Sequence, residues 1–119
     1  MATTSRPEDI ARAALPLTPV ALQILLALAD RERHGLGIAE EIEATTAGKM
    51  VLGPGTLYGA MKRLLETGLV DEPEDTPKGA SADPRRRYYR ITPAGARALE
   101  LEARALSGIL KVVRAKRVL

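Results

Sequence analysis

The run from Val20 to Ala29 is almost entirely apolar, and no other feature of the sequence constrains the fold as strongly. At helical spacing Leu22, Leu25, Leu26 and Ala29 share a face, so the run predicts a helix. A helix with so little polar surface has to be buried on more than one side. The remaining residues must therefore supply elements that surround it.

Two Thr-Pro pairs mark the starts of helices. Thr18 is a good N-cap residue, and Pro19 fits the first helical position, where its missing N–H has no cost. Thr92 and Pro93 repeat the pair before a helix that we expect to extend to about residue 116. These signals predict where the apolar helix and a long C-terminal helix begin.

The first 16 residues are expected to form an N-terminal arm. Residues 1–7 are small and polar and end in proline, which predicts disorder. Residues 8–15 are rich in alanine and predict a short helix that Pro16 stops.

Glycine and proline residues divide the stretch 34–68 into two further helices. The segment His34-Gly35-Leu36-Gly37 predicts a turn that opens the first of them, and Gly48 predicts its end. Its inner stripe is expected to contain Leu36, Ala39, Ile42 and Thr46. The next helix opens at Pro54-Gly55-Thr56 and ends at Gly68. Its inner stripe is expected to contain Leu57, Met61 and Leu64, with Ala60 and Leu65 beside them.

A hairpin with a long tip is expected after these helices. Leu69-Val70 begins a strand, residues 73–84 have the composition of a loop, and residues 85–91 predict a second strand. We expect the two strands to pair with each other.

The long C-terminal helix carries a heptad seam that is too short for an independent coiled coil. Inside one domain it could pack on the first apolar helix. That helix is apolar nearly all round, however, so both elements have surplus apolar surface that a homodimer would cover. The expected dimer interface consists of Leu22 and Leu26 on the apolar helix and Leu99, Ala103, Leu106, Leu110 and Val113 on the seam.

Three short helices followed by a two-stranded hairpin form the layout of a winged helix-turn-helix domain, in which the third helix enters the major groove of DNA. We expect a mainly α fold with a small β-hairpin. The winged helix-turn-helix would occupy residues 17–92 and the dimerisation helix residues 93–119. The charges support this layout, because residues 76–90 carry five basic residues and one acid, whereas residues 30–46 carry two basic residues and five acids.

The composition excludes several classes of protein. The 119 residues include no cysteine and one histidine, which excludes disulfides, thiolate metal sites and a cysteine nucleophile. No nucleophile–base pair or glycine-rich phosphate loop is evident, so we expect no enzymatic activity and no cofactor. No apolar run reaches the roughly 18 residues of a membrane span, and the N-terminus lacks the apolar core of a secretory signal. A cytoplasmic location is therefore expected.

Two motifs resemble a known family. Residues 53–64, GPGTLYGAMKRL, followed by Gly68-Leu69-Val70, resemble the recognition-helix signature of PadR-type transcriptional regulators. Residues 87–95, RYYRITPAG, resemble that family's second wing strand and its entry into the C-terminal helix. At residues 34–38 the family has an aromatic-Gly-aromatic run, from which HGLGI departs. The resemblance covers about residues 17–99.

The resemblance implies a cytoplasmic homodimeric repressor that binds a palindromic operator in double-stranded DNA. In that family the C-terminal part makes the dimer, and a single C-terminal helix is similar to its short subgroup. Some relatives bind small aromatic or multidrug-like molecules between aromatic side chains at the dimer interface. This chain has no Trp and no Phe. A planar-ligand sandwich is therefore not expected, while release by a small-molecule effector of unknown identity stays open.

On the third helix the candidate DNA contacts are Gly55, Thr56, Tyr58, Gly59, Lys62 and Arg63. A helix N-terminus offers free N–H groups to a phosphate, although the first residues could serve only as caps. The hydroxyl of Tyr58 is expected to reach DNA, unless Tyr58 packs against the wing. Gly59 would let the backbone approach DNA closely, or be an indifferent helix position. Lys62 and Arg63 supply positive charge, although Arg63 could instead pair with Glu66.

Further candidate contacts lie outside this helix. Arg85, Arg86 and Arg87 form a basic run, which is most often a solvated face but on a hairpin of this kind favours contacts to the DNA backbone. Lys78 lies on the tip of the hairpin. His34 is foremost a turn residue and could also donate to a phosphate.

The function predicted from these features is sequence-specific DNA binding by a transcriptional regulator, with repression expected. The alternative is a winged-helix protein-interaction module, in which the same surface binds an acidic partner and DNA plays no part.

Overall fold

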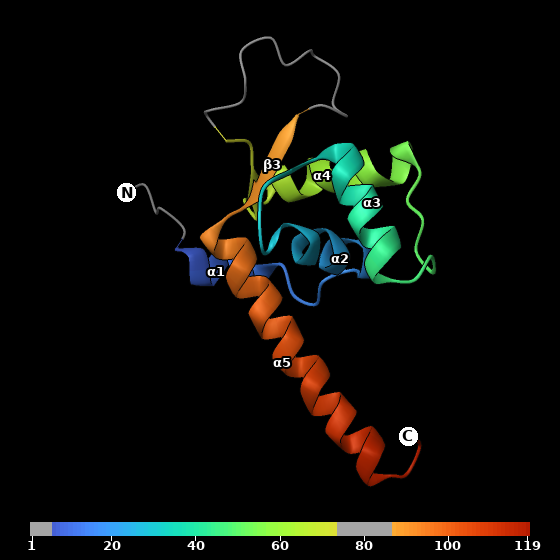
Figure 1. Cartoon of the computed structure of the whole chain (residues 1–119). Helices are drawn as coiled ribbons and strands as arrows, with labels where there is room; N and C mark the ends of the chain where they lie inside the picture. The colour runs from blue at the N-terminus through green and yellow to red at the C-terminus, as the bar shows by residue number, and fades with distance from the viewer. Residues whose placement is uncertain (1–5, 74–86) are drawn as a thin grey trace.

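The computed structural model describes residues 6–73 and 87–119 (Figure 1). Its elements in chain order are α1 (Pro7–Ala13), α2 (Pro19–Leu28), β1 (Arg33–His34), α3 (Gly35–Thr45), α4 (Pro54–Glu66), β2 (Val70–Asp71), β3 (Tyr88–Ile91) and α5 (Pro93–Ala115). A mainly helical fold with a small antiparallel sheet is therefore confirmed. The expected tip of the hairpin lies outside the described residues. Within the described residues, no helix combines the length and the apolar character that crossing a bilayer requires.

The helix α2 packs against α3, α4, α5 and β3. The predicted N-cap is confirmed, because the hydroxyl of Thr18 accepts a hydrogen bond from the N–H of Ala21 at 3.1 Å. The buried residues of α2 are Ile24, Leu25, Ala27 and Leu28. Leu26 is 48% exposed, so one face of this apolar helix is left uncovered by its own chain.

The buried stripe of α3 differs from the predicted one. Gly35, Ile38 and Ile42 are buried, whereas Leu36, predicted to face inward, is 52% exposed. Leu36 lies six residues before Ile42, and at about 100° per residue this separation places the two side chains about 120° apart, so Leu36 lies beside the stripe instead of in it. α3 ends at Thr45, before the predicted stop at Gly48, and the two residues that follow its C-cap Thr46, Ala47 and Gly48, have φ angles of +53° and +77°.

The inner stripe of α4 is the one that the sequence predicts, with Leu57, Ala60, Met61 and Leu64 buried. Gly68 ends the helix with a φ of +81°. The N–H of Leu69 donates to the carbonyl of Leu64 at 3.0 Å, the six-to-one hydrogen bond of a Schellman motif. Because the inner stripe is fixed in this way, the opposite face of α4 points outward.

The sheet contains three antiparallel strands in the order β1-β3-β2. The predicted pairing of the two hairpin strands is confirmed, with Val70 opposite Ile91 and Asp71 opposite Arg90. The third strand, β1, was not predicted and places His34 opposite Tyr88. The central strand β3 therefore joins the start of α3 to the base of the wing.

The long helix α5 begins at the predicted Thr-Pro pair, where the hydroxyl of Thr92 accepts from the N–H of Gly95 at 3.0 Å. Its first half packs on α1, α2 and β3, and its second half projects away from the rest of the molecule (Figure 1). α1 is a helix where one was expected, and its residue Ala11 is fully buried in the core. The division of the chain at residues 16 and 92 stays a prediction.

Candidate nucleic-acid interface

The outer face of α4 is open. At helical spacing Gly55, Gly59 and Lys62 lie opposite the buried stripe. A Cβ atom added to Gly55 or Gly59 would meet nothing within 4 Å. Gly53 caps the helix without a side-chain hydrogen bond, so no side chain blocks the N–H groups of the first turn next to the exposed Thr56. A flat or concave polyanion can thus approach both the side and the start of this helix.

Lys62 and Arg63 are exposed and form no ion pair with any residue in the part of the chain that the structure describes. The expected alternative, a pair between Arg63 and Glu66, is not formed. Arg63 lies toward one flank of α4, beside Thr18 and Thr67. Both cations are available to an external anion.

Tyr58 is half-buried and lies across the start of α3. A Cβ atom added to Gly35 would come within 2.5 Å of the Tyr58 hydroxyl, so the absence of a side chain at Gly35 makes room for this ring. Tyr58 therefore packs on α3, a contact that the sequence did not reveal. Its contact with DNA stays a prediction.

The base of the wing carries paired charges. The guanidinium of Arg90 donates to the carboxylate of Asp71 at 2.7 Å, across the β2–β3 pair. Arg87 lies 3.7 Å from Glu72. Acidic residues also stand at positions 71, 72, 74 and 75 of the sequence. Over residues 71–90 the acidic and basic residues are therefore equal in number, and the excess of positive charge disappears. The basic character predicted for the hairpin is therefore offset at its base. Lys78, Arg85 and Arg86 lie outside the described residues.

Tyr89 anchors the wing to the core. Its side chain is buried, and this burial raises the pKa of its phenol above the ordinary value.

His34 occupies the N-cap position of α3. Its Nδ1 atom accepts a hydrogen bond from the N–H of Gly37 at 2.8 Å. The imidazole also meets the ring of Tyr88 edge-on, with 5.6 Å between the centroids. The expected turn role is thus observed, and the contact with a phosphate stays a prediction. Among the described residues no cluster of three His, Asp or Glu side chains could hold a metal ion.

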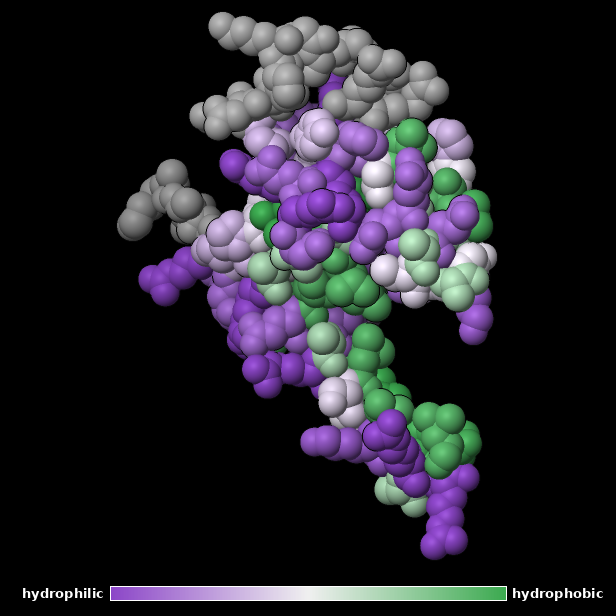
Figure 2. Space-filling view, in the orientation of Figure 1, coloured by the Kyte–Doolittle hydropathy of each residue, from purple (hydrophilic) through white to green (hydrophobic). Residues whose placement is uncertain are grey.

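An apolar strip runs along the projecting half of α5 (Figure 2). Of the predicted seam, Leu106 is 45% and Leu110 is 39% exposed. Ile109 and Val112, which the predicted seam omitted, are exposed by 58% and 54% and widen the strip. The seam residues Ala103 and Val113 are exposed and half-buried, respectively.

The other predicted dimer contacts fall into two groups. Leu99 packs partly against the core of its own chain. Leu22 is half-buried and Leu26 is exposed, one turn apart on α2. Of the predicted interface, the strip on α5 and this face of α2 are thus apolar surface that their own chain leaves uncovered.

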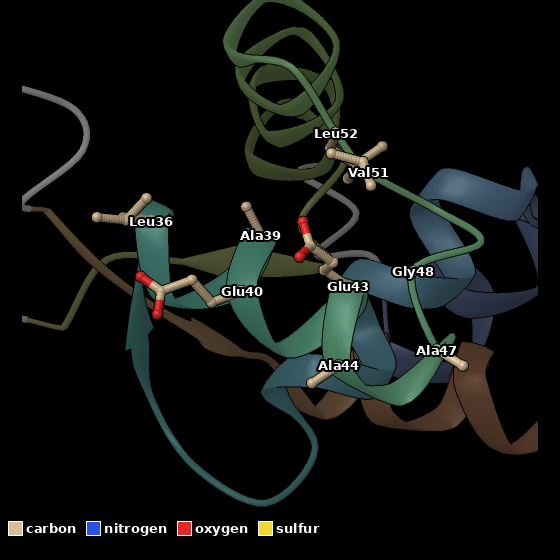
Figure 3. A pocket seen from close by; sticks show the side chains of 9 residues that line it. All are labelled: Leu36, Ala39, Glu40, Glu43, Ala44, Ala47, Gly48, Val51 and Leu52. Atoms are coloured by element: carbon tan, nitrogen blue, oxygen red, sulfur yellow. The ribbon is translucent and has the colours of Figure 1, made fainter.

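A groove of about 630 Å³ lies between α3 and the connection to α4 (Figure 3). Leu36 and the exposed Val51 supply apolar surface, and Glu40 and Glu43 of α3 also line the groove. Neither carboxylate forms an ion pair with any of residues 6–73 or 87–119. The groove thus combines apolar walls with negative charge that is free to meet a cation.

Comparisons with known proteins agree with this geometry. The sequence profile described as the transcriptional regulator PadR-like family matches residues 24–101. The chain is 38% identical over 94 residues to the transcriptional regulator Rv3488 of Mycobacterium tuberculosis, across 79% of this chain and 81% of that protein. It is 42% identical over 84 residues to an uncharacterized 37.1 kDa protein in transposon TN4556 of Streptomyces fradiae. That match includes 71% of this chain but spans only 22% of the Streptomyces protein.

The fold is also similar to solved structures. The crystal structure of a PadR family transcription regulator from Clostridium difficile R20291 superposes with a TM-score of 0.67 and 26% sequence identity. The match covers 82% of this chain and 97% of that chain.

Proposed function

This chain belongs to the PadR-like family of transcriptional regulators, and we propose that it is a repressor that binds a palindromic operator as a homodimer. Regulators of this family bind DNA and are not enzymes. The proposal includes a surface that contacts DNA, a surface through which two copies form the dimer, and an effector that releases the dimer from DNA.

The outer face of α4 is the proposed recognition surface, and its openness is the observation that carries the proposal. The major groove of B-DNA admits an α-helix, and Lys and Arg side chains bind guanine edges and phosphates. Lys62 and Arg63 are the proposed cations, because neither is used by an ion pair within the described residues. The unblocked start of α4 near Thr56 would bind a phosphate.

The wing is proposed to contact the DNA backbone beside the recognition helix. Arg87 is the described member of the basic run and already lies next to Glu72. Arg85, Arg86 and Lys78 belong to the same proposal on the basis of their charge.

The homodimer is supported by apolar surface that the chain does not cover itself. The strip on α5, which contains Leu106, Ile109, Leu110 and Val112, continues over about two turns of helix. Contiguous apolar surface of this kind marks an interaction site. Its self-association would give the twofold symmetry that a palindromic operator requires.

An effector of matching chemistry is proposed for the groove beside α3. A small organic cation with an apolar body suits its apolar walls and its two carboxylates, Glu40 and Glu43. The groove includes Val51 and Leu52, which lead directly into the start of α4, so an occupant there would act on the recognition helix. Since a transcriptional regulator acts on DNA, a cytoplasmic location is part of the proposal.

The effector site is tested with tetraphenylphosphonium as the probe. We expect it to raise the melting temperature of the wild-type protein and to lower its affinity for DNA, with both effects reduced in the Glu43→Gln variant. Equal shifts in the wild type and the variant would exclude this groove.

The repressor proposal is tested by footprinting on the DNA upstream of the chain's own gene. We expect two protected half-sites whose centres lie about one helical turn apart, roughly 34–36 Å. Affinity should fall steeply as salt rises, because each neutralised phosphate releases a counterion. Protection of a single half-site, or an affinity that does not change with salt, would contradict the proposal and favour a protein partner instead.

A further inference from the structure

His34 is an unusual residue to cap a helix. The residues that normally cap helices, Ser, Thr, Asp and Asn, keep an oxygen acceptor at every pH near neutrality. At the start of α3 the acceptor is instead the imidazole Nδ1 atom, 2.8 Å from the backbone nitrogen of Gly37. A histidine nitrogen can accept a hydrogen bond only while it carries no proton.

The same side chain connects two elements that are far apart in the sequence. His34 lies opposite Tyr88 in the β1–β3 pair. The two rings meet at an interplanar angle of 79° and a centroid separation of 5.6 Å. The orientation that lets Nδ1 cap α3 thus also sets the contact with the wing strand β3.

We propose that His34 is a positioning residue that joins the start of α3 to the wing strand, and that protonation of its imidazole releases this connection. A proton on Nδ1 would point at the N–H of Gly37, which is itself a hydrogen-bond donor. The two donors cannot bond to each other, so the cap hydrogen bond would be lost. The new positive charge would also lie at the positive end of the helix dipole, where cations are unfavourable. Both effects act in the same direction, against the capped arrangement.

The charged surroundings of His34 do not change over the same range of pH. The groups that line the hollow beside it are Arg31, Glu32 and Arg33 before the helix, Glu40 on α3 and Tyr88 on β3. Arg33 is also within 3.5 Å of Glu41 on α3 and 3.4 Å of Asp30. Between about pH 5.5 and pH 8, carboxylates, guanidiniums and phenols ordinarily keep one charge state. His34 is also the only histidine in the chain, so the imidazole signals in an NMR spectrum belong to it.

This inference concerns the free protein and does not depend on the operator. The wing strand continues from Tyr88 to Ile91 and then enters α5 through Thr92, so release at His34 would also loosen the contact with the base of the wing. A failure of the proposed DNA recognition would leave it untouched.

Amide hydrogen exchange of Gly37 is the measurement that tests the proposal. After correction for intrinsic exchange, we expect the protection of this amide in the wild type to fall about fivefold between pH 8 and pH 5.5, the ratio that loss of one ordinary cap produces. Gly95 serves as the control in the same molecule, because its amide is capped by the hydroxyl of Thr92, which does not titrate. Its protection should stay constant.

The His34→Asn variant keeps a cap acceptor but cannot be protonated. We expect its Gly37 protection to be the same at both pH values and close to that of the wild type at pH 8. A wild type and a variant with the same pH profile would overturn the proposal. Nitrogen-15 NMR of the wild-type imidazole gives a second test that needs no variant. At pH 8 the proton should be on Nε2, and a proton on Nδ1 would overturn the proposal equally.

Discussion

Replacing Gly95 with alanine would force the start of α5 away from the base of the wing. Gly95 is buried, and an added Cβ atom would overlap the carbonyl oxygen of Leu69 and lie 2.8 Å from Cγ1 of Ile91. The carbonyl of Leu69 is held in place, because it also accepts the N–H of Thr92 at 3.1 Å. The obstacle is therefore backbone that cannot move without breaking a hydrogen bond at the helix start.

The size of the effect follows from two opposing contributions. Alanine gains about 1 kcal/mol over glycine inside a helix. Overpacking a rigid site costs about 1–3 kcal/mol and more where backbone is the neighbour. Because the overlap at Leu69 is with backbone, we expect the free energy of unfolding to fall by about 2 kcal/mol in the Gly95→Ala variant.

Gly108 offers a matched control on the same helix. It is exposed, and an added Cβ atom would meet nothing within 4 Å. The Gly108→Ala variant should therefore gain up to about 1 kcal/mol. Urea denaturation at one protein concentration compares both variants with the wild type, since a dimer makes stability depend on concentration. A Gly95→Ala variant as stable as the wild type would refute the packing described for the α5 start.

Three further predictions concern DNA binding, assembly and pH. The Lys62→Glu variant should bind DNA at least tenfold more weakly than the wild type, with a smaller salt dependence. The same change at Lys111 on α5 should have little effect on DNA affinity. Filter binding compares the two variants, and equal losses of affinity would contradict the proposal that α4 is the recognition surface. The Ile109→Asp variant should sediment as a monomer, because it places a charge in the apolar strip, and an unchanged dimer would exclude this strip as the interface. The hydrogen bond from Arg97 lowers the pKa of Glu8 in the folded protein. This ion pair therefore stabilises the fold fully above the ordinary carboxyl pKa of 4.5, and its contribution is lost as the pH falls through the lower pKa that Glu8 has in the folded state. Urea midpoints between pH 6 and pH 3 should decline less in Glu8→Gln than in the wild type, and parallel declines would argue against this ion pair.

Signals that act within one turn of helix predicted much of the fold. The hydroxyls of Thr18 and Thr92 cap α2 and α5 as expected. Gly68 directly follows the C-cap of α4 with a positive φ angle, and Gly48 follows the end of α3 two residues beyond its C-cap. These outcomes depend on a few neighbouring residues, and for that reason the sequence alone was sufficient.

Features that depend on distant segments were missed or misplaced. The strand β1 has two residues and no pattern of its own, and it forms only because β3 pairs with it. The ion pair between Asp71 and Arg90 requires the register of the β2–β3 pair. Leu36 does not share a face with Ile42, because a separation of six helical residues turns the side chain by about 120° away from the stripe that Ile38 and Ile42 form.

The candidate site was predicted in outline. The inner stripe of α4 located its outer face, and with it Lys62. The packing of Tyr58 on Gly35 was not evident, because it joins two helices through a side chain that glycine lacks. Ile109 and Val112 were omitted from the seam because a strict heptad describes a narrower stripe than the apolar face that α5 presents.

The distance between two recognition helices bound to one duplex tests the central claim most directly. The chain contains no cysteine, so a Glu66→Cys variant carries one spin label per subunit at the exposed C-terminal end of α4, outside the proposed DNA contacts. When the labelled protein is bound to an operator duplex identified by footprinting, pulsed electron–electron double resonance should give a distance between the two labels near one helical turn of DNA, about 34–36 Å. A complex without any dipolar signal, or with a distance that matches no whole number of turns, would contradict a symmetric pair of α4 helices in successive major grooves.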